Sequence, residues 1–134
     1  MKRIAGESST TDQFVRRAGS DLAGFPNGEW TVHPGPQKVG FGESGYSEGL
    51  VDGDGHPNRH FTGNFVFGYQ TAPSVSKVAA VVREIPGFGL IGGCSTGCSS
   101  QDVKLGKLGA DAAGELHSGK IDKADVGDWI RKNL

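Results

Sequence analysis

Glycine is the residue that most restricts what this chain can fold into, because 23 of its 134 residues are glycine. This share is more than twice the usual value of about 7%, and each glycine loses more conformational entropy on folding than any other residue. Most of the glycines lie in the first half of the chain and around residues 87–97. We therefore expect long irregular loops there, with regular structure in the remaining segments.

The remaining segments carry helical signals. Thr10 is a typical N-cap residue, so a first helix is predicted from there to Gly19 or Gly24. Four more helices are predicted from the spacing of apolar residues and from the residues that cap or break helices. They span residues 59–70, 75–84, 100–118 and 122–134, with Asp122 as the cap of the last.

A small β-hairpin is predicted near the N-terminal third. Two short alternating runs, residues 29–33 and 37–41, flank the turn-forming sequence Pro34-Gly35-Pro36.

The chain is predicted to be a single domain, residues 1–134, in which residues 28–57 form a loop and hairpin region and residues 58–134 form a helical core. The predicted fold class is mainly α (α+β), a compact domain of about five helices with a loop-rich N-terminal third. The apolar residues assigned to the core sides of the last three helices are Val78, Val81, Val82, Ile85, Val103, Leu105, Leu108, Ala112, Ala113, Leu116, Val126, Trp129, Ile130 and Leu134.

One predicted helix combines an ionisable side chain, an amide and several aromatic rings. Phe61, Phe65 and Tyr69 are four residues apart, so they share one helical face. His60 and Asn64 share a neighbouring face. A histidine beside an apolar wall is what a small catalytic site needs, and it is equally what a packed core histidine looks like.

Other polar residues at the starts or ends of three successive helices could join His60. In this hypothesis His60 is the general acid or base, Glu84 or Asp102 orients it, and Arg59 or Arg83 stabilises developing negative charge. The alternative is that the arginines and carboxylates form simple ion pairs and that His60 caps or packs. The candidate residues are Arg59, His60, Asn64, Arg83, Glu84 and Asp102.

Composition limits the class of protein. The formal net charge is −1, whereas proteins that bind nucleic acids without sequence preference usually have a basic excess. No run approaches the roughly 18 apolar residues of a membrane span, and the first residues lack the apolar core of a signal peptide. The chain is therefore expected to be cytosolic, exported without a cleaved signal, or a domain of a longer protein.

No cofactor or metal site is predicted. Cys94 and Cys98 supply half a zinc site, and no histidine follows at finger spacing. A loop disulfide and two reduced thiols both remain open for this pair. Asp52 and Asp54 begin like a calcium loop, but the glycine at its sixth position and the glutamate at its twelfth are missing.

Two signatures in the chain resemble a family of bacterial toxins. The sequences Asn64-Phe65-Val66-Phe67-Gly68-Tyr69 and Lys104-Leu105-Gly106 are similar to the paired signatures of the type-44 toxin domain, a helical domain at the C-termini of polymorphic toxins. The resemblance covers roughly residues 58–116. It implies an antibacterial toxin or effector, a hydrolase with RNA as its first expected substrate, and a cognate immunity protein as partner.

Further motifs resemble a related uncharacterised domain that carries Arg-His, His-Glu and Asp-x-x-Asn-Asn. The corresponding residues here are Arg59-His60, Arg83-Glu84 and Asp102. The chain departs from these patterns at Arg83 and at Leu105-Gly106, and it has Val66 where the type-44 pattern often has histidine. These departures count against a transferred metal site or a mechanism with two histidines.

The site residues that these resemblances imply are therefore His60, Asn64, Glu84 and Asp102, with Arg59 beside them. Two other functions stay open, a hydrolase of the cell envelope that acts on peptidoglycan or phospholipid, and a binding module without catalysis. The oligomeric state is not predicted.

Overall fold

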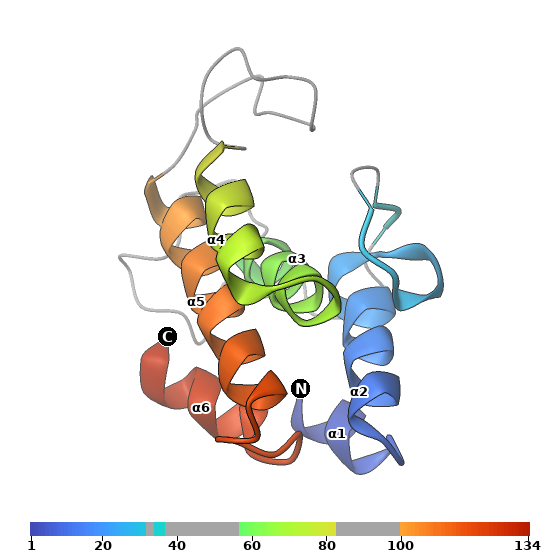
Figure 1. Ribbon diagram of the computed structural model, residues 1–134. Helices are drawn as coiled ribbons and strands as arrows, with labels where there is room; N and C mark the ends of the chain where they lie inside the picture. The colour runs from blue at the N-terminus through green and yellow to red at the C-terminus, as the bar shows by residue number, and fades with distance from the viewer. Residues whose placement is uncertain (32–33, 37–56, 83–99) are drawn as a thin grey trace.

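The computed structural model describes residues 1–31, 34–36, 57–82 and 100–134. Within these ranges the chain is helical and contains no strand, so the prediction of a compact, mainly helical fold is confirmed (Figure 1). The elements are α1 (Lys2–Gly6), α2 (Thr11–Ala18), the π-helical turn η1 (Gly19–Ala23), the 3₁₀ turn η2 (Pro26–Gly28), α3 (Pro57–Gln70), α4 (Pro73–Val82), α5 (Ser100–His117) and α6 (Val126–Asn133).

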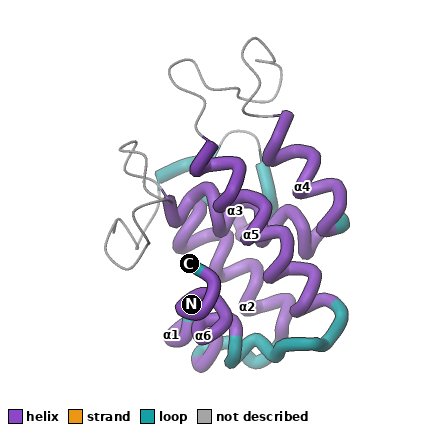
Figure 2. Tube along the Cα trace, turned by 90° about the vertical axis from the view of Figure 1, so that its left-hand side faces the viewer, coloured by secondary structure: helices purple, strands orange, loops and turns teal. Residues whose placement is uncertain are grey.

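Helix α3 is the centre of the fold. It lies between α5 on one side and α2 with η1 on the other, and it also contacts α4 (Figure 1). The six consecutive residues from Phe61 to Val66 are all buried, as expected for a helix that is surrounded by other helices. Helices α1 and α6 lie together at the opposite end of the molecule from the C-terminus of α4 (Figure 2), joined by an ion pair between Lys2 and Asp128.

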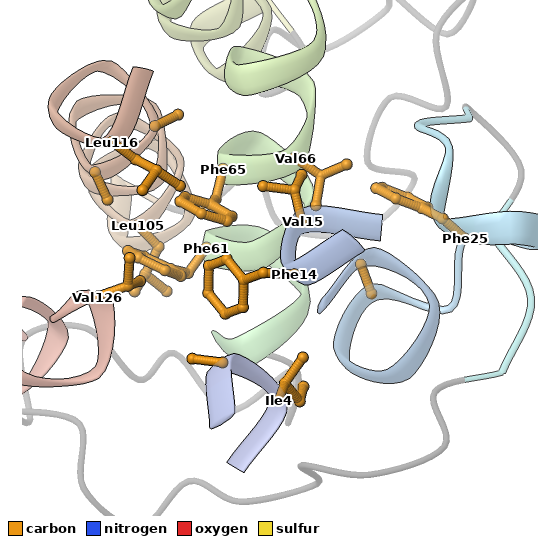
Figure 3. Packing of buried hydrophobic residues seen from close by; sticks show 14 residues of the cluster. Ile4, Phe14, Val15, Phe25, Phe61, Phe65, Val66, Leu105, Leu116 and Val126 are labelled. Atoms are coloured by element: carbon orange, nitrogen blue, oxygen red, sulfur yellow. The ribbon is translucent and has the colours of Figure 1, made fainter. Parts of the chain in front are cut away.

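Two residues of the aromatic face predicted for α3, Phe61 and Phe65, lie in the middle of the hydrophobic core (Figure 3), and Tyr69 packs against this core from a half-buried position. Phe61 and Phe65 are 1% and 0% exposed, and their rings stack with centroids 6.3 Å apart. Phe14 of α2 meets Phe65 edge to face at 6.1 Å. Burying each such side chain stabilises the fold by roughly 1.5–3 kcal/mol, so these rings fix how α2 and α3 pack. Other helices complete the cluster with Ile4, Leu105, Leu116 and Val126.

The predicted apolar side of α4 is wrong at Val78 and Val81, whereas Val82 is half-buried and Ile85 lies outside the described residues. Val75, Val78 and Val81 are 49%, 62% and 40% exposed, while the residues of α4 that are buried are Ser76 and Ala80. The small residues face inward because α4 lies close to α3 and α5, where a β-branched side chain would not fit.

Other boundaries differ from expectation by a few residues. The last helix begins at Val126, preceded by Asp125, and Asp122 lies in the turn before it. Helix α1 was not predicted. Most of the predicted hairpin lies outside the described residues, and residues 29–31 and 34–36 form no strand.

Candidate functional site

The structure brings together two of the predicted site residues, His60 and Asp102. His60 lies in the first turn of α3 and Asp102 in the first turn of α5. The imidazole Nε2 is 3.4 Å from Asp102 Oδ1, and the two side chains are 11% and 7% exposed. A carboxylate at this distance from an imidazole can hold the ring in one orientation and stabilise its protonated form.

Glycines on α5 allow this approach. A Cβ atom on Gly109 would lie 2.2 Å from the backbone oxygen of Phe61. A Cβ atom on Gly106 would lie 2.9 Å from the Asn64 side-chain nitrogen and 2.7 Å from the Ala80 Cβ. Asp102, Gly106 and Gly109 follow one another at helical spacing on one face of α5. The same face that packs against α3 therefore places Asp102 beside His60.

Asn64 belongs to a buried hydrogen-bond network. Its side-chain amide donates to the backbone oxygen of His60 at 3.0 Å. The Ser76 hydroxyl of α4 lies 2.7 Å from the Asn64 backbone oxygen and 3.3 Å from its side-chain oxygen. Both ends of this amide thus have protein partners, and Asn64 links α3 to α4 beside the His60–Asp102 pair.

Arg59 holds a loop. Its Nη2 atom donates to the backbone oxygens of Pro34 and Gly35, at 3.3 and 3.1 Å, and so connects this loop to the start of α3. The predicted residues Arg83 and Glu84 lie outside the described ranges, as do Cys94 and Cys98.

The backbone around the pair also favours negative charge. Both residues are in the first turns of their helices, where backbone N–H groups lack helical partners and the helix dipole is positive. Such ends stabilise anions, including phosphate groups. An imidazole with a carboxylate partner beside two helix N-termini can exchange a proton while negative charge develops nearby.

Sequence reasoning missed a concave region elsewhere in the molecule, a pocket of about 540 Å³. Its walls come from α2, from the segment after η2 and from the C-terminal end of α3. The Tyr69 hydroxyl donates to Asp12 Oδ1 at 3.0 Å. Burial, the hydrogen bond to Asp12 and the charge of Asp12 all raise the pKa of Tyr69. The pocket is lined by Asp12, Val15, Arg16, Glu29, Trp30, Tyr69 and Gln70.

No local pattern in the sequence indicates this pocket. Asp12 and Tyr69 are 57 positions apart, and the charged residues of α2 look like an ordinary solvated face. The tertiary packing alone brings them together.

The described residues contain no group of three or more histidine, cysteine or acidic side chains that could hold a metal ion. None of the helices within the described ranges is long and apolar enough to cross a membrane. Comparisons of the chain with protein-family models, with curated proteins and with solved structures find no match.

Proposed function

We propose that this chain is a hydrolytic effector domain in which His60 and Asp102 form the proton-transfer pair, with RNA as its substrate. The observation that carries the proposal is the approach of the two side chains to 3.4 Å from the first turns of separate helices. The resemblance of residues 58–116 to polymorphic toxin domains gives the substrate class and the antibacterial role.

The chemistry is metal-independent transfer of a phosphoryl group within RNA. His60 removes the proton of the 2′-hydroxyl, and the resulting oxygen attacks the adjacent phosphorus to form a 2′,3′-cyclic phosphate. The bond to the 5′ oxygen breaks, and that oxygen takes up a proton from water. Asp102 stabilises the imidazolium that forms, as the carboxylate of a catalytic triad does. The N-terminal ends of α3 and α5 favour the negative charge on the non-bridging phosphate oxygens.

The test is cleavage of RNA by the purified chain in the presence of a chelator, together with growth of bacteria that express it in the cytoplasm. We compare the unmodified chain with His60→Gln and Asp102→Asn, which keep side-chain size close to the original. Matched controls are His117→Gln and Asp111→Asn, which change the same residue types on α5 away from the pair. Circular dichroism and thermal unfolding show which variants fold.

The expected result is cleavage and growth arrest for the unmodified chain and both controls, with loss of about 10²-fold or more in rate for His60→Gln. Intact RNA and normal growth with the unmodified chain would overturn the proposal. Toxicity only when the chain is sent to the periplasm would overturn RNA as substrate and favour an envelope hydrolase.

The burial of the pair supports a second candidate, a non-catalytic module in which His60 and Asp102 fasten α3 to α5. His60 and Asp102 are only 9% and 7% exposed as residues, and Asn64 beside them is part of a structural network. If this second candidate is right, Asp102→Asn and His60→Gln lower the free energy of unfolding. No variant then changes RNA cleavage, because the unmodified chain cleaves no RNA. Removing one partner of a buried pair costs about 3–5 kcal/mol, which a denaturant titration detects.

A further inference from the structure

The pocket between α2 and the C-terminal end of α3 has the size of a ligand site. Its volume of about 540 Å³ lies within the range of about 300–1,000 Å³ that is typical of small-molecule sites. Its lining residues include neither His60 nor Asp102. It is therefore a separate feature from the proposed proton-transfer pair.

The charges of the pocket select against anions. Among the described residues that line it, two carboxylates, Asp12 and Glu29, stand against one guanidinium, that of Arg16. Arg16 Nη1 pairs with Glu29 Oε1 at 2.7 Å. Asp12 forms no ion pair with any described residue and accepts a hydrogen bond from the neutral Tyr69 hydroxyl. The excess charge of the described lining is thus negative and is centred on Asp12.

The aromatic residues of the pocket are held in place. The Trp30 ring stacks on Phe67 with centroids 4.3 Å apart, and the Trp30 backbone nitrogen donates to the Gln70 side chain at 3.0 Å. Gln70 in turn donates to the Gly28 backbone oxygen at 3.0 Å. The Tyr69 ring packs edge to face with His117 while its hydroxyl bonds Asp12. An aromatic site that is already ordered loses little entropy when it binds a ligand.

We propose that this pocket binds an organic ammonium group, a cation carried on apolar carbon. Trp30 and Tyr69 supply aromatic rings that attract such a cation and cover its carbon atoms. Asp12 supplies the opposite charge. Because the charged lining groups are largely exposed, with Arg16 and Glu29 side chains 53% and 63% accessible, the affinity is in the millimolar range.

The experiment follows the two tryptophan indole N–H signals of the full chain by two-dimensional NMR. The sequence has two tryptophans: Trp30 lines the pocket, whereas Trp129 lies on α6 and donates its indole N–H to Glu115. Trp129 is thus an internal control in the same spectrum. The probe is choline, and its matched neutral analogue is 3,3-dimethylbutan-1-ol, which has the same shape without the charge.

Choline should shift the Trp30 signal saturably and leave the Trp129 signal in place, and the neutral analogue should bind about two- to fivefold more weakly. Asp12→Asn should weaken choline binding by a similar factor, since asparagine still accepts the Tyr69 hydrogen bond but lacks the charge. Asp122→Asn, which removes the same charge from the exposed turn before α6, should have no effect.

A blocked trimethyllysine residue in place of choline separates the two sources of an ammonium group. Tighter binding of the lysine derivative assigns the pocket to a protein side chain, and tighter binding of choline assigns it to a free amine. Equal binding of choline and the neutral analogue would overturn the proposal. The same holds if Asp12→Asn binds choline as the unmodified chain does, or if no saturable shift of Trp30 occurs.

Discussion

At the scale of a single residue, the position of Asp102 beside His60 depends on the lack of a side chain at Gly109. A Cβ atom there would lie 2.2 Å from the Phe61 backbone oxygen, so Gly109→Ala must push α5 away from α3. We expect a loss of about 1–3 kcal/mol in the free energy of unfolding, and a lower rate in any reaction that uses the pair.

Urea denaturation measures this loss, with Gly6→Ala as the control because a Cβ atom at Gly6 would meet nothing within 4 Å. Equal stability of the two variants would contradict the close packing described for α5.

Ser76 is the residue that shows whether Asn64 has a structural role. Its hydroxyl contacts two oxygens of Asn64 from a fully buried position. Ser76→Ala should cost about 1–3 kcal/mol, because the buried oxygens lose their donor, while the turnover per folded molecule stays the same. Ser74→Ala on the exposed side of α4 should be neutral in the same denaturation experiment. A loss of turnover with unchanged stability would instead place Asn64 in the chemistry.

At the scale of elements, Glu7 joins α1 to α2 in a way that depends on pH. The hydrogen bond from Arg17, followed by that from Arg3, lowers the pKa of the Glu7 carboxyl below its ordinary value of 4.5. A lowered folded-state pKa means that the stabilisation is present above the unfolded-state pKa and is lost as pH falls through the folded-state pKa.

Glu7→Gln should therefore be less stable than the unmodified chain at pH 7, and the two should converge in strong acid. Urea titrations between pH 7 and pH 2 measure the difference, and Arg17→Gln should show the same convergence. A difference that does not change with pH would show that the Glu7 charge contributes nothing to stability.

Helix α4 shows why apolar spacing alone misplaced a helix face. Its valines give a clear hydrophobic stripe in the sequence, but Val78 is 62% exposed and Ser76 and Ala80 are buried. Close packing against α3 and α5 requires small residues on the buried face of α4. The spacing of apolar residues does not reveal this requirement, because it takes no account of side-chain size.

We expect Val78→Thr to change the free energy of unfolding by less than about 0.5 kcal/mol, whereas Ala80→Val should cost about 1–3 kcal/mol through overpacking. Thermal and urea unfolding of the two variants provide the measurement. A large loss in the free energy of unfolding for Val78→Thr would mean that the Val78 side chain is buried against other residues.

For the whole molecule, local signals predicted most helices, whereas contacts between distant residues decided the candidate site. Caps and apolar spacing located α2, α3 and α5, because those signals act within a few residues. The approach of Asp102 to His60 depends on how α5 packs against α3, and no local pattern encodes that distance. The pocket at Asp12 and Tyr69 was missed for the same reason.

The charge of the whole molecule predicts how salt should affect the proposed cleavage of RNA. The formal net charge is −1, and several described cations are already paired: Lys2 with Asp128, Arg16 with Glu29, Arg17 with Glu7 and Lys77 with Asp111. Lys104 and Lys107 are the two lysines of α5, the helix that carries Asp102, and both are exposed; they are therefore the cations whose contact with phosphates we test.

One or two phosphate contacts correspond to a slope of about −0.7 to −1.4 when the logarithm of kcat/KM for single-stranded RNA is plotted against the logarithm of salt concentration. Replacing Lys104 and Lys107 together by glutamine should bring this slope close to zero. The same replacement at Lys120 and Lys132, which are exposed beyond the C-terminal end of α5, changes net charge equally and should leave the slope unchanged. An equal effect of both double variants would mean that net charge, and not a phosphate contact beside Asp102, controls how the chain meets RNA.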